Sequence, residues 1–231
     1  MDTKIDHRIR VGAHRRHEMQ VRLLFSGLVL ASKKSIHEID VEDVIEQADV
    51  SRGTFYKYYP SVRALFRELS LQLAEEIAID YDLIALQMPD PLWRLSCITR
   101  GVMRLTVDIP LIGKLAIQNE WPSDNFELSI LSGLAKDLEL CIESNKVDKA
   151  SLSIGMGLIG GSIRSGIFHM LKNAPCTGYE DMVMYHILIG LGVAKETAEI
   201  VSKLPIPQPP PFPQDGVLAK IGELVKLPKN E

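Results

Sequence analysis

Residues 41–59 constrain this chain most, because they read as two short helices joined by a tight turn. The first half has one apolar face at helical spacing, made of Val41, Val44, Ile45 and Ala48. Asp40 is placed to accept the free N–H groups at the start of this helix, and Ser51 is a natural cap for a second helix that begins near Arg52. The segment therefore predicts a helix-turn-helix.

The second predicted helix is crowded with residue types that contact DNA. Arg52 and Thr54 fall in its first turn, where a recognition helix meets base edges. Gly53 leaves room for close approach to the wall of the groove. We expect phosphate contacts further along, from Tyr56, Lys57 and Tyr58. Phe55 and Tyr59 lie four residues apart and are expected to face inward.

The run at 50–59, Val-Ser-Arg-Gly-Thr-Phe-Tyr-Lys-Tyr-Tyr, followed by a new helix from Ser61, resembles the DNA-binding region of TetR-family transcriptional regulators. The resemblance covers residues 15–80 and implies a preceding helix at 15–32. The same helix is indicated independently by an apolar set consisting of Met19, Leu23, Leu24, Leu28 and Ala31. The family implies an all-α protein, with an N-terminal three-helix DNA-binding domain and a larger C-terminal helical domain for ligand binding and dimerisation.

The sequence departs from the family pattern at three places. The usual glycine of the turn is Asp49, which tolerates a left-handed conformation. Ser35 and Asp40 replace the usual Gly and Thr before the first helix of the motif, and Asp40 can cap as Thr does. Val62 replaces the usual phosphate-binding Lys, so we expect Arg63 beside it to substitute.

Charge is distributed in a way that suits a DNA-binding protein despite the net charge of -4. Residues 1–34 carry eight Lys or Arg against three Asp or Glu, whereas residues 35–51 carry six acids and no Lys or Arg. These acids must point away from phosphate. A basic arm is expected at residues 1–14, and a solvated disordered arm is the alternative for residues 1–12. The DNA-binding residues expected are Ser51, Arg52, Gly53, Thr54, Tyr56, Lys57, Tyr58, Arg63, Arg15 and Arg16.

Several classes of protein fit the sequence poorly. Cys97, Cys141 and Cys176 are odd in number and lack metal-binding spacing, so we expect neither a disulfide framework nor a zinc site. No catalytic cluster or phosphate-cradling loop is evident, which argues against an enzyme and against a cofactor. The longest uncharged run, residues 150–163, is too short to span a bilayer. We expect a cytoplasmic regulator with no membrane partner.

The second half reads as helices with short breaks at proline-containing turns. Helices are predicted at 91–108, 111–120, 125–145, 149–172, 179–191 and 195–204. Six small residues lie in the otherwise apolar helix at 149–172: Gly155, Gly157, Gly160, Gly161, Ser162 and Gly166. Each glycine costs about 1 kcal/mol in a helix relative to alanine, so several together indicate a close helix–helix contact.

In the TetR family the last two long helices form a four-helix dimer interface, which 149–172 and 179–191 resemble in position. The expected interface residues are Gly157, Gly161, Ile163, Phe168, Met184, Ile187 and Leu191. The alternative is that these glycines pack within one subunit. A helix-turn-helix also needs a dimer to read two half-sites one turn apart.

A small-molecule pocket is the family's usual second site. Its candidate lining residues are Trp93, Met103, Trp121, Phe126 and Phe168, with Arg100, Arg104 and His169 as orienting polar groups. The alternative is that they are simply core residues. We expect the regulatory and dimerisation domain at 81–204.

The composition changes after Leu204, where six prolines at 205–213 predict a stiff extended linker. Beyond it, an apolar stripe at helical spacing consists of Val217, Leu218, Ile221, Leu224 and Val225. We therefore predict that residues 205–231 are a linker and a short amphipathic helix, which docks on the C-terminal domain of its own or the partner subunit.

Together these features predict a homodimeric DNA-binding regulator that acts as a repressor on a palindromic operator in double-stranded DNA. The resemblance implies release by a small, largely apolar effector. The alternative is a helical module whose helix-turn-helix docks on a protein instead of DNA. A steep dependence of binding on salt would distinguish DNA from a protein partner.

Overall fold

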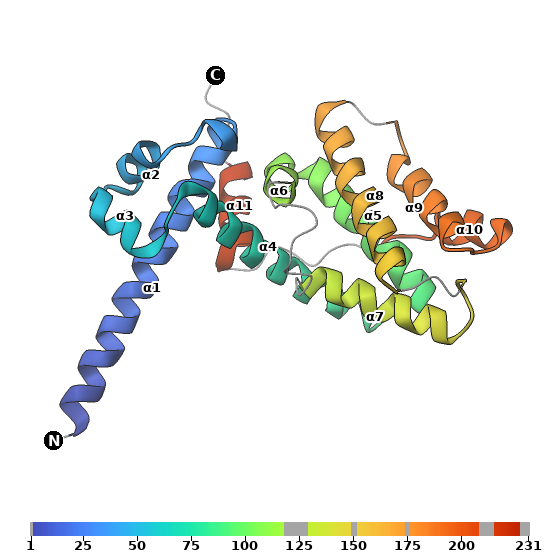
Figure 1. The fold of residues 1–231 in the computed structure, drawn as a ribbon, viewed down its shortest axis with the longest axis horizontal. Coiled ribbons are helices and arrows are strands. Elements are labelled where there is room, and N and C mark those ends of the chain that lie inside the picture. The colour runs from blue at the N-terminus through green and yellow to red at the C-terminus, as the bar shows by residue number, and fades with distance from the viewer. Residues whose placement is uncertain (1, 118–128, 149–151, 174–175, 208–214, 227–231) are drawn as a thin grey trace. The chain divides into compact units, whose positions relative to one another are not determined.

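A computed structural model of the chain describes residues 2–117, 129–148, 152–173, 176–207 and 215–226. These residues form α-helices and one short 3-10 helix, and no strand occurs among them, which confirms the all-α prediction. The chain divides into two compact units, residues 1–70 with 220–231, and residues 71–219 (Figure 1).

The first unit is built on α1 (Asp2–Lys33), a 3-10 helix (Ile36–Glu38), α2 (Val41–Ala48), α3 (Arg52–Tyr58) and the first turns of α4 (Val62–Ala85). Its core is made of apolar residues from each helix that are almost fully buried, among them Leu23, Leu28, Val44, Phe55 and Leu65. A Cβ on Gly27 would lie 2.5 Å from Leu65, so α1 and α4 cross closely at this glycine.

The first helix is longer than the sequence suggested. It begins at Asp2, so the segment expected as a basic arm is helical along with the predicted 15–32. The physical reason is that residues 2–14 hold no proline and a single glycine, and their Lys and Arg are good helix formers. No stop signal separates this segment from the apolar stripe that follows.

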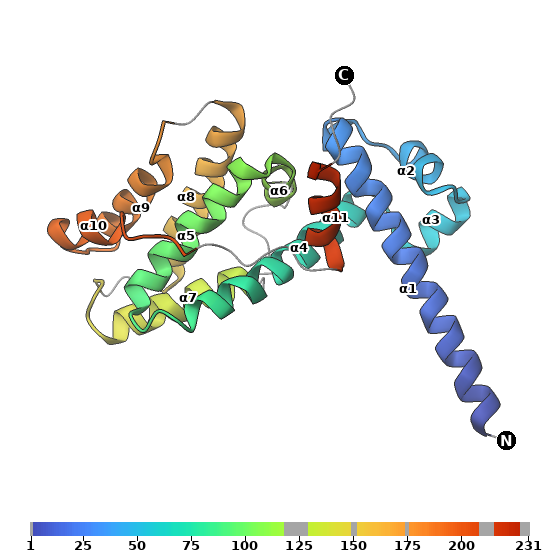
Figure 2. The same cartoon turned by 180° about the vertical axis from the view of Figure 1, so that it is seen from behind.

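The second unit is arranged around α5 (Pro91–Asp108), which contacts α6 (Pro110–Ala116), α7 (Ser129–Glu143), α8 (Leu152–Lys172), α9 (Tyr179–Gly190) and α10 (Lys195–Val201). Figures 1 and 2 show α5 and α8 side by side from opposite directions. The predicted helix at 91–108 has its predicted bounds because the Asp90 carboxylate caps the N–H groups of Leu92 and Trp93 and Pro91 occupies the first turn. Helices α7, α8, α9 and α10 end within three residues of the predicted positions. The predicted helix ends at 120, 125 and 149 lie outside the described residues.

The C-terminal helix α11 (Gly216–Lys226) confirms the helix predicted after the proline run. Within the second unit, the N–H groups of Val217 and Leu218 donate to the Glu76 carboxylate of α4, at 2.8 and 2.7 Å. This carboxylate caps the helix from a distant part of the chain.

From Lys220 onward α11 belongs to the first unit, where the Lys220 ammonium lies 5.3 Å from the centre of the Phe25 ring on α1. Within its own chain, this part of the helix is therefore grouped with the first unit and not with the predicted C-terminal domain. Leu218 and Ile221 of the apolar stripe are buried, as expected for a short helix that is only marginally stable alone.

Candidate nucleic-acid interface

The turn between α2 and α3 is held by local hydrogen bonds. At the start of α2, Asp40 and Asp43 form a capping box in which each carboxylate accepts the other residue's backbone N–H, at 2.9 Å. Asp49 adopts the left-handed conformation, with φ 50° and ψ 59°, so the aspartate replaces the usual glycine as predicted. The Ser51 hydroxyl accepts the N–H of Thr54 at 3.1 Å and so caps α3.

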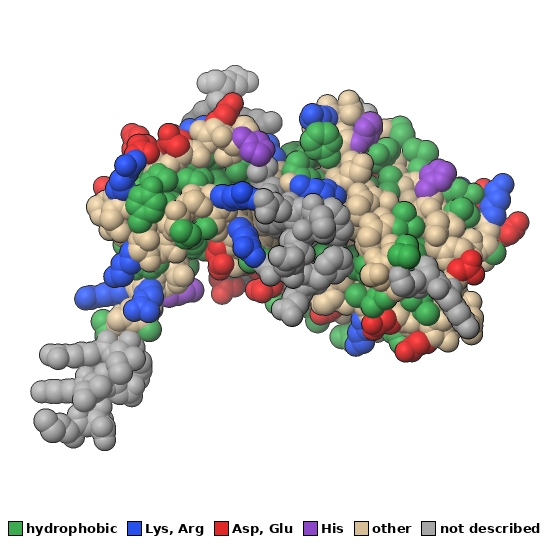
Figure 3. All heavy atoms as spheres, viewed as in Figure 1, with side chains coloured by type: hydrophobic (Ala, Val, Ile, Leu, Met, Phe, Trp, Pro, Cys, Tyr) green, Lys and Arg blue, Asp and Glu red, His purple; other side chains and the backbone are tan. Residues whose placement is uncertain are grey.

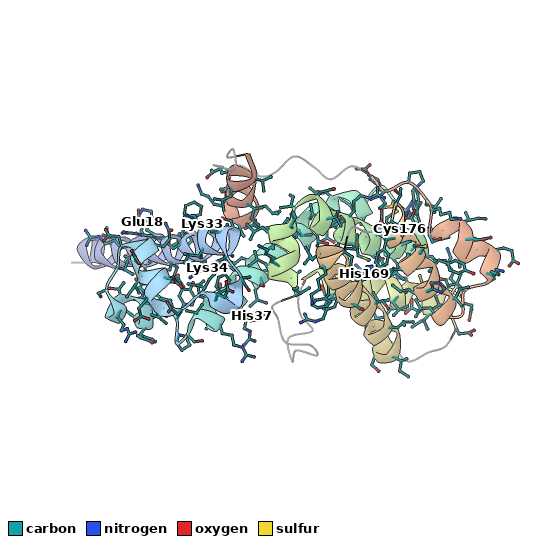
Figure 4. The ribbon with its side chains drawn as sticks, turned by 90° about the horizontal axis from the view of Figure 1, so that it is seen from above. Glu18, Lys33, Lys34, His37, His169 and Cys176 are labelled. Atoms are coloured by element: carbon teal, nitrogen blue, oxygen red, sulfur yellow. The ribbon has the colours of Figure 1, made fainter. Side chains whose placement is uncertain are left out.

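Two basic side chains of the preceding segment brace this motif. Arg22 of α1 donates to the carbonyl oxygen of Asp49 at 3.1 Å, which fixes the turn to the first helix. Lys34, just beyond the end of α1, donates to the Asp43 carboxylate at 2.6 Å (Figure 4). The Lys34 bond and the backbone N–H of Asp40 hold the pKa of Asp43 below its usual value. The motif is therefore tied to α1 at both ends of α2.

Helix α3 separates an inner aromatic side from an outer polar side. Phe55 is fully buried and Tyr59 is nearly so, as their four-residue spacing predicted. Burial raises the pKa of the Tyr59 phenol to about 12. The outer side presents Arg52, Gly53 and Lys57, which are exposed, and Tyr56, which is half exposed. The exposed side chains are thus held outward by a rigid aromatic anchor.

The remaining residues expected to contact DNA differ in their exposure and lie on different helices. Thr54 and Tyr58 are half-buried, and the Thr54 hydroxyl shares a hydrogen bond of 2.9 Å with that of Ser51. Arg63 is exposed at the start of α4, where the Ser61 hydroxyl accepts the N–H of Ala64. Arg15 and Arg16 are exposed on α1. The structure thus brings the α3 residues together, while Arg15 and Arg16 stand on a different helix.

Acidic and basic side chains are mixed over this part of the molecule. Figure 3 shows acidic side chains over α2 and basic ones beside them and along α1. One acid was not anticipated from the sequence: Glu42 of α2 accepts a hydrogen bond from the Arg52 guanidinium of α3. Their ten-residue separation gives no local signal, and only the crossing of two helices in a helix-turn-helix brings the pair together.

Comparison with known proteins agrees with this geometry. Residues 23–69, which span the end of α1 through the start of α4, match the family described as bacterial regulatory proteins, tetR family. The HTH-type transcriptional repressor KstR of Mycolicibacterium smegmatis is 33% identical over 107 residues, which is 44% of this chain and 50% of that protein. Residues 23–69 are therefore similar to the DNA-binding region of TetR-family regulators. The matched segment spans about half the length of this curated relative.

Two solved structures share the fold over most of the chain. RolR in complex with resorcinol superposes with a TM-score of 0.70 at 18% identity, covering 85% of this chain and 98% of RolR. The fatty acid degradation regulator FadR of Bacillus halodurans gives a TM-score of 0.54 at 14% identity, covering 76% of this chain and 97% of FadR. At these identities the two structures show a shared fold and no more.

In the second unit, four glycines of α8 divide into two groups. A Cβ on Gly155 would lie 2.7 Å from Leu138, and a Cβ on Gly166 would lie 2.5 Å from Met103. These two glycines therefore pack within the subunit. A Cβ on Gly157 or Gly161 would meet nothing within 4 Å. The second group forms a bare strip, extended by three exposed apolar side chains, Ile154 and Phe168 of α8 and Met182 of α9.

Three residues expected at a dimer interface lie inside the subunit instead. Met184, Ile187 and Leu191 are at most 2% exposed, so the expectation for these three is wrong. Ile163 is half-buried and packs against the buried cluster of Met103, Ile167 and Met170. Helix α9 is apolar nearly all round, so its sequence does not show which side the subunit itself buries.

The polar residues expected to orient a ligand are engaged within the fold. Arg100 is 2% exposed and donates to the Asp181 carboxylate at 2.9 Å, to the hydroxyl of Ser96 and to the carbonyl oxygen of Leu204. Arg104 pairs with Glu180, and this hydrogen bond raises the pKa of Arg104. The two guanidinium groups therefore join α5 to α9.

The other candidate ligand residues are dispersed. Met103 is fully buried in the core and Trp93 is half-buried on α5. His169 is exposed and its ring stacks on Tyr179 with centroids 4.9 Å apart (Figure 4). Trp121 and Phe126 lie outside the described residues. A cleft beside α9 and α10, lined by Asp181, Tyr185, His186 and Lys203 among others, includes none of the candidates.

Two further observations concern the described residues only. None of their helices is both long enough and apolar enough to cross a membrane. They hold no group of three or more His, Cys, Asp or Glu side chains placed to bind a metal ion. Nε2 of His14 lies 3.2 Å from the carboxylate of Glu18, one turn further along α1.

Proposed function

We propose that this TetR-family protein is a transcriptional repressor that binds a palindromic operator as a homodimer and is released by a small, largely apolar ligand. In this proposal residues 15–80 bind DNA and residues 81–204 form the regulatory and dimerisation domain. The observation that carries the proposal is the polar outer side of α3, which is rigidly backed by Phe55 and Tyr59 and set by the capped turn before it.

The proposal divides the work of α3 between two kinds of contact. Arg52 and Thr54 lie in the first turn and supply contacts to base edges, whereas Tyr56 and Lys57 lie further along and supply contacts to phosphates. Phosphate contacts contribute affinity on every sequence, while a bidentate arginine–guanine contact is worth about 1–3 kcal/mol of discrimination. The two groups of residues therefore affect different measurements.

The proposed dimer is formed by the bare strip of Gly157 and Gly161 on α8, with Ile154 and Phe168 beside it and Met182 on α9. Glycines that meet nothing within the subunit leave the backbone open to close approach by a second copy. Large apolar side chains next to them lose solvent contact in the same step, which favours association. A two-fold dimer then places two α3 helices on the two halves of a palindrome.

The ligand-release part of the proposal is supported by what related proteins bind. The solved RolR structure contains resorcinol, and FadR is described as a regulator of fatty acid degradation. Both descriptions are compatible with a largely apolar effector in the helical second unit. Physically, the effector must bind better to the conformation that does not hold DNA, because only a difference in affinity can shift the equilibrium.

The proposal is tested by selecting duplexes from a random DNA library and measuring their affinity for the protein between 50 and 200 mM salt. A protein that contacts several phosphates loses affinity steeply over this range. Lys57→Ala should weaken binding to all duplexes and reduce the salt slope by about one. Arg52→Ala should weaken binding mainly to the selected duplex. A flat salt dependence, or no enrichment, would contradict the proposal and favour a protein partner.

A further inference from the structure

The first helix of the motif and the recognition helix are joined by an ion pair on their outer surface. Arg52 is the first residue of α3 and Glu42 the second residue of α2, and Nη2 of Arg52 donates to Oε1 of Glu42. The side chains are 59% and 58% exposed. The pair therefore stands in solvent on the polar side of the motif, and not in its core.

Such a pair has little value for folding. Exposed ion pairs contribute about 0–1 kcal/mol to stability, because water screens the charges and two long side chains lose freedom. A carboxylate on this surface is also repelled by the phosphates of an approaching duplex. Neither stability nor general affinity for DNA explains an acid at position 42, so its effect must be sought in the direction of the arginine.

The bond to Glu42 leaves most of the guanidinium donors available. Arginine has five N–H donors in a planar fork, and the bond to Glu42 uses one of them on Nη2. The others remain oriented by the same bond and match the O6 and N7 acceptors of guanine, which arginine contacts in pairs. An unpaired arginine would instead sample many rotamers and reach phosphates as readily as bases.

We infer that Glu42 is a specificity-determining residue that positions Arg52 for one guanine in the operator. The inference rests on the proposed function, that α3 reads DNA. Glu42 acts in two ways: it holds the guanidinium in one direction, and its negative charge penalises complexes in which Arg52 turns away to a phosphate. Removing the charge should therefore raise affinity for random DNA while lowering discrimination.

Glu46 provides a matched control. It lies one turn further along α2, is exposed, and forms no ion pair with Arg52. Glu46→Gln removes the same charge as Glu42→Gln from the same helix. A purely electrostatic effect on DNA binding will appear in both variants, and only the positioning effect is confined to Glu42→Gln.

The experiment measures the ratio of affinities for a duplex enriched by the wild-type protein and for a random duplex of equal length, at one salt concentration. Glu42→Gln should lower this ratio about tenfold, as expected for loss of much of one bidentate contact. Glu46→Gln should change the ratio less than about twofold. In an Arg52→Ala background, Glu42→Gln should have no further effect on the ratio. Melting temperatures of the single variants should remain close to that of the wild type.

Two results would overturn the inference alone: equal ratios for Glu42→Gln and Glu46→Gln, or a loss of discrimination from Glu42→Gln that persists without Arg52. If the wild-type protein enriched no duplex at all, the proposed function would fail, and this inference with it. Enrichment by the wild type is scored before any variant is compared, so the two failures are distinguishable.

Discussion

Replacing Gly53 by alanine should have opposite effects on folding and on DNA binding. A Cβ at this position meets only the Ser51 hydroxyl, at 3.9 Å, which is ordinary van der Waals contact. Gly53 lies in helix α3 with a backbone conformation that alanine also adopts. The substitution should therefore stabilise the free protein by about 0.4–1 kcal/mol, because alanine restricts the unfolded chain.

The same methyl group projects from the outer side of α3, where the proposed interface needs the backbone close to the groove wall. Overpacking a tight contact costs about 1–3 kcal/mol, so affinity for an enriched duplex should fall roughly 5- to 150-fold. Thermal unfolding and gel-shift titration measure the two quantities. The control is Gly133→Ala on α7, where a Cβ meets nothing within 4 Å; it should stabilise the protein without changing DNA affinity. Unchanged DNA binding by a stabilised Gly53→Ala protein would refute the close approach of α3.

Three other predictions concern the dimer, the core and pH. Gly161→Leu should weaken the dimer, as measured by sedimentation, while the subunit stays folded. Gly133→Leu should leave the dimer unchanged. An unchanged dimer in the Gly161→Leu variant would exclude the α8 face as the interface. Arg100→Met should lower the free energy of unfolding by about 3–5 kcal/mol, because it leaves the partly buried Asp181 carboxylate without its partner. A loss below about 1 kcal/mol would contradict a structural role for Arg100. Because the folded-state pKa of Asp43 is lowered, its contribution to stability is present above the unfolded pKa and lost as pH falls through the folded value. Asp43→Asn should remove this contribution to the pH dependence of the free energy of unfolding, which is measured by unfolding the protein at several pH values. An unchanged pH dependence in the variant would contradict the hydrogen bond between Lys34 and Asp43.

The helix-turn-helix was predictable because its determinants are local. Asp40 and Ser51 cap the helices that directly follow them, and Asp49 takes a conformation that its own short polar side chain tolerates. Phe55 and Tyr59 face inward because helical spacing places residues four apart on one side. None of these inferences requires knowledge of a distant part of the chain.

The second unit was less predictable because its decisive contacts join distant residues. Arg100 and Asp181 are 81 residues apart, and both belong to helices on which a charged residue has several possible partners. Their pairing turns a candidate ligand contact into a structural crosslink. Glu76 likewise caps α11 from 141 residues away, although Asp215 stands nearer in the sequence.

The buried side of α9 could not be predicted from the sequence, for a different reason. Its apolar residues surround the helix, so periodicity predicts a helix in an apolar environment without showing which side faces the subunit core. Met184 and Ile187 face inward, and Met182 faces outward. On α8, composition identified the glycines, but only the packing of neighbouring side chains separates Gly155 from Gly161.

In the proposed complex, two copies of α3 enter the major groove of one palindromic duplex. Methylation interference at guanine N7 on a duplex enriched by the full-length protein tests it most directly, because this atom lies in the major groove. We expect two clusters of sensitive guanines related by two-fold symmetry, with centres about one helical turn, or a whole multiple of it, apart. A single cluster, or interference confined to positions without such symmetry, would contradict it.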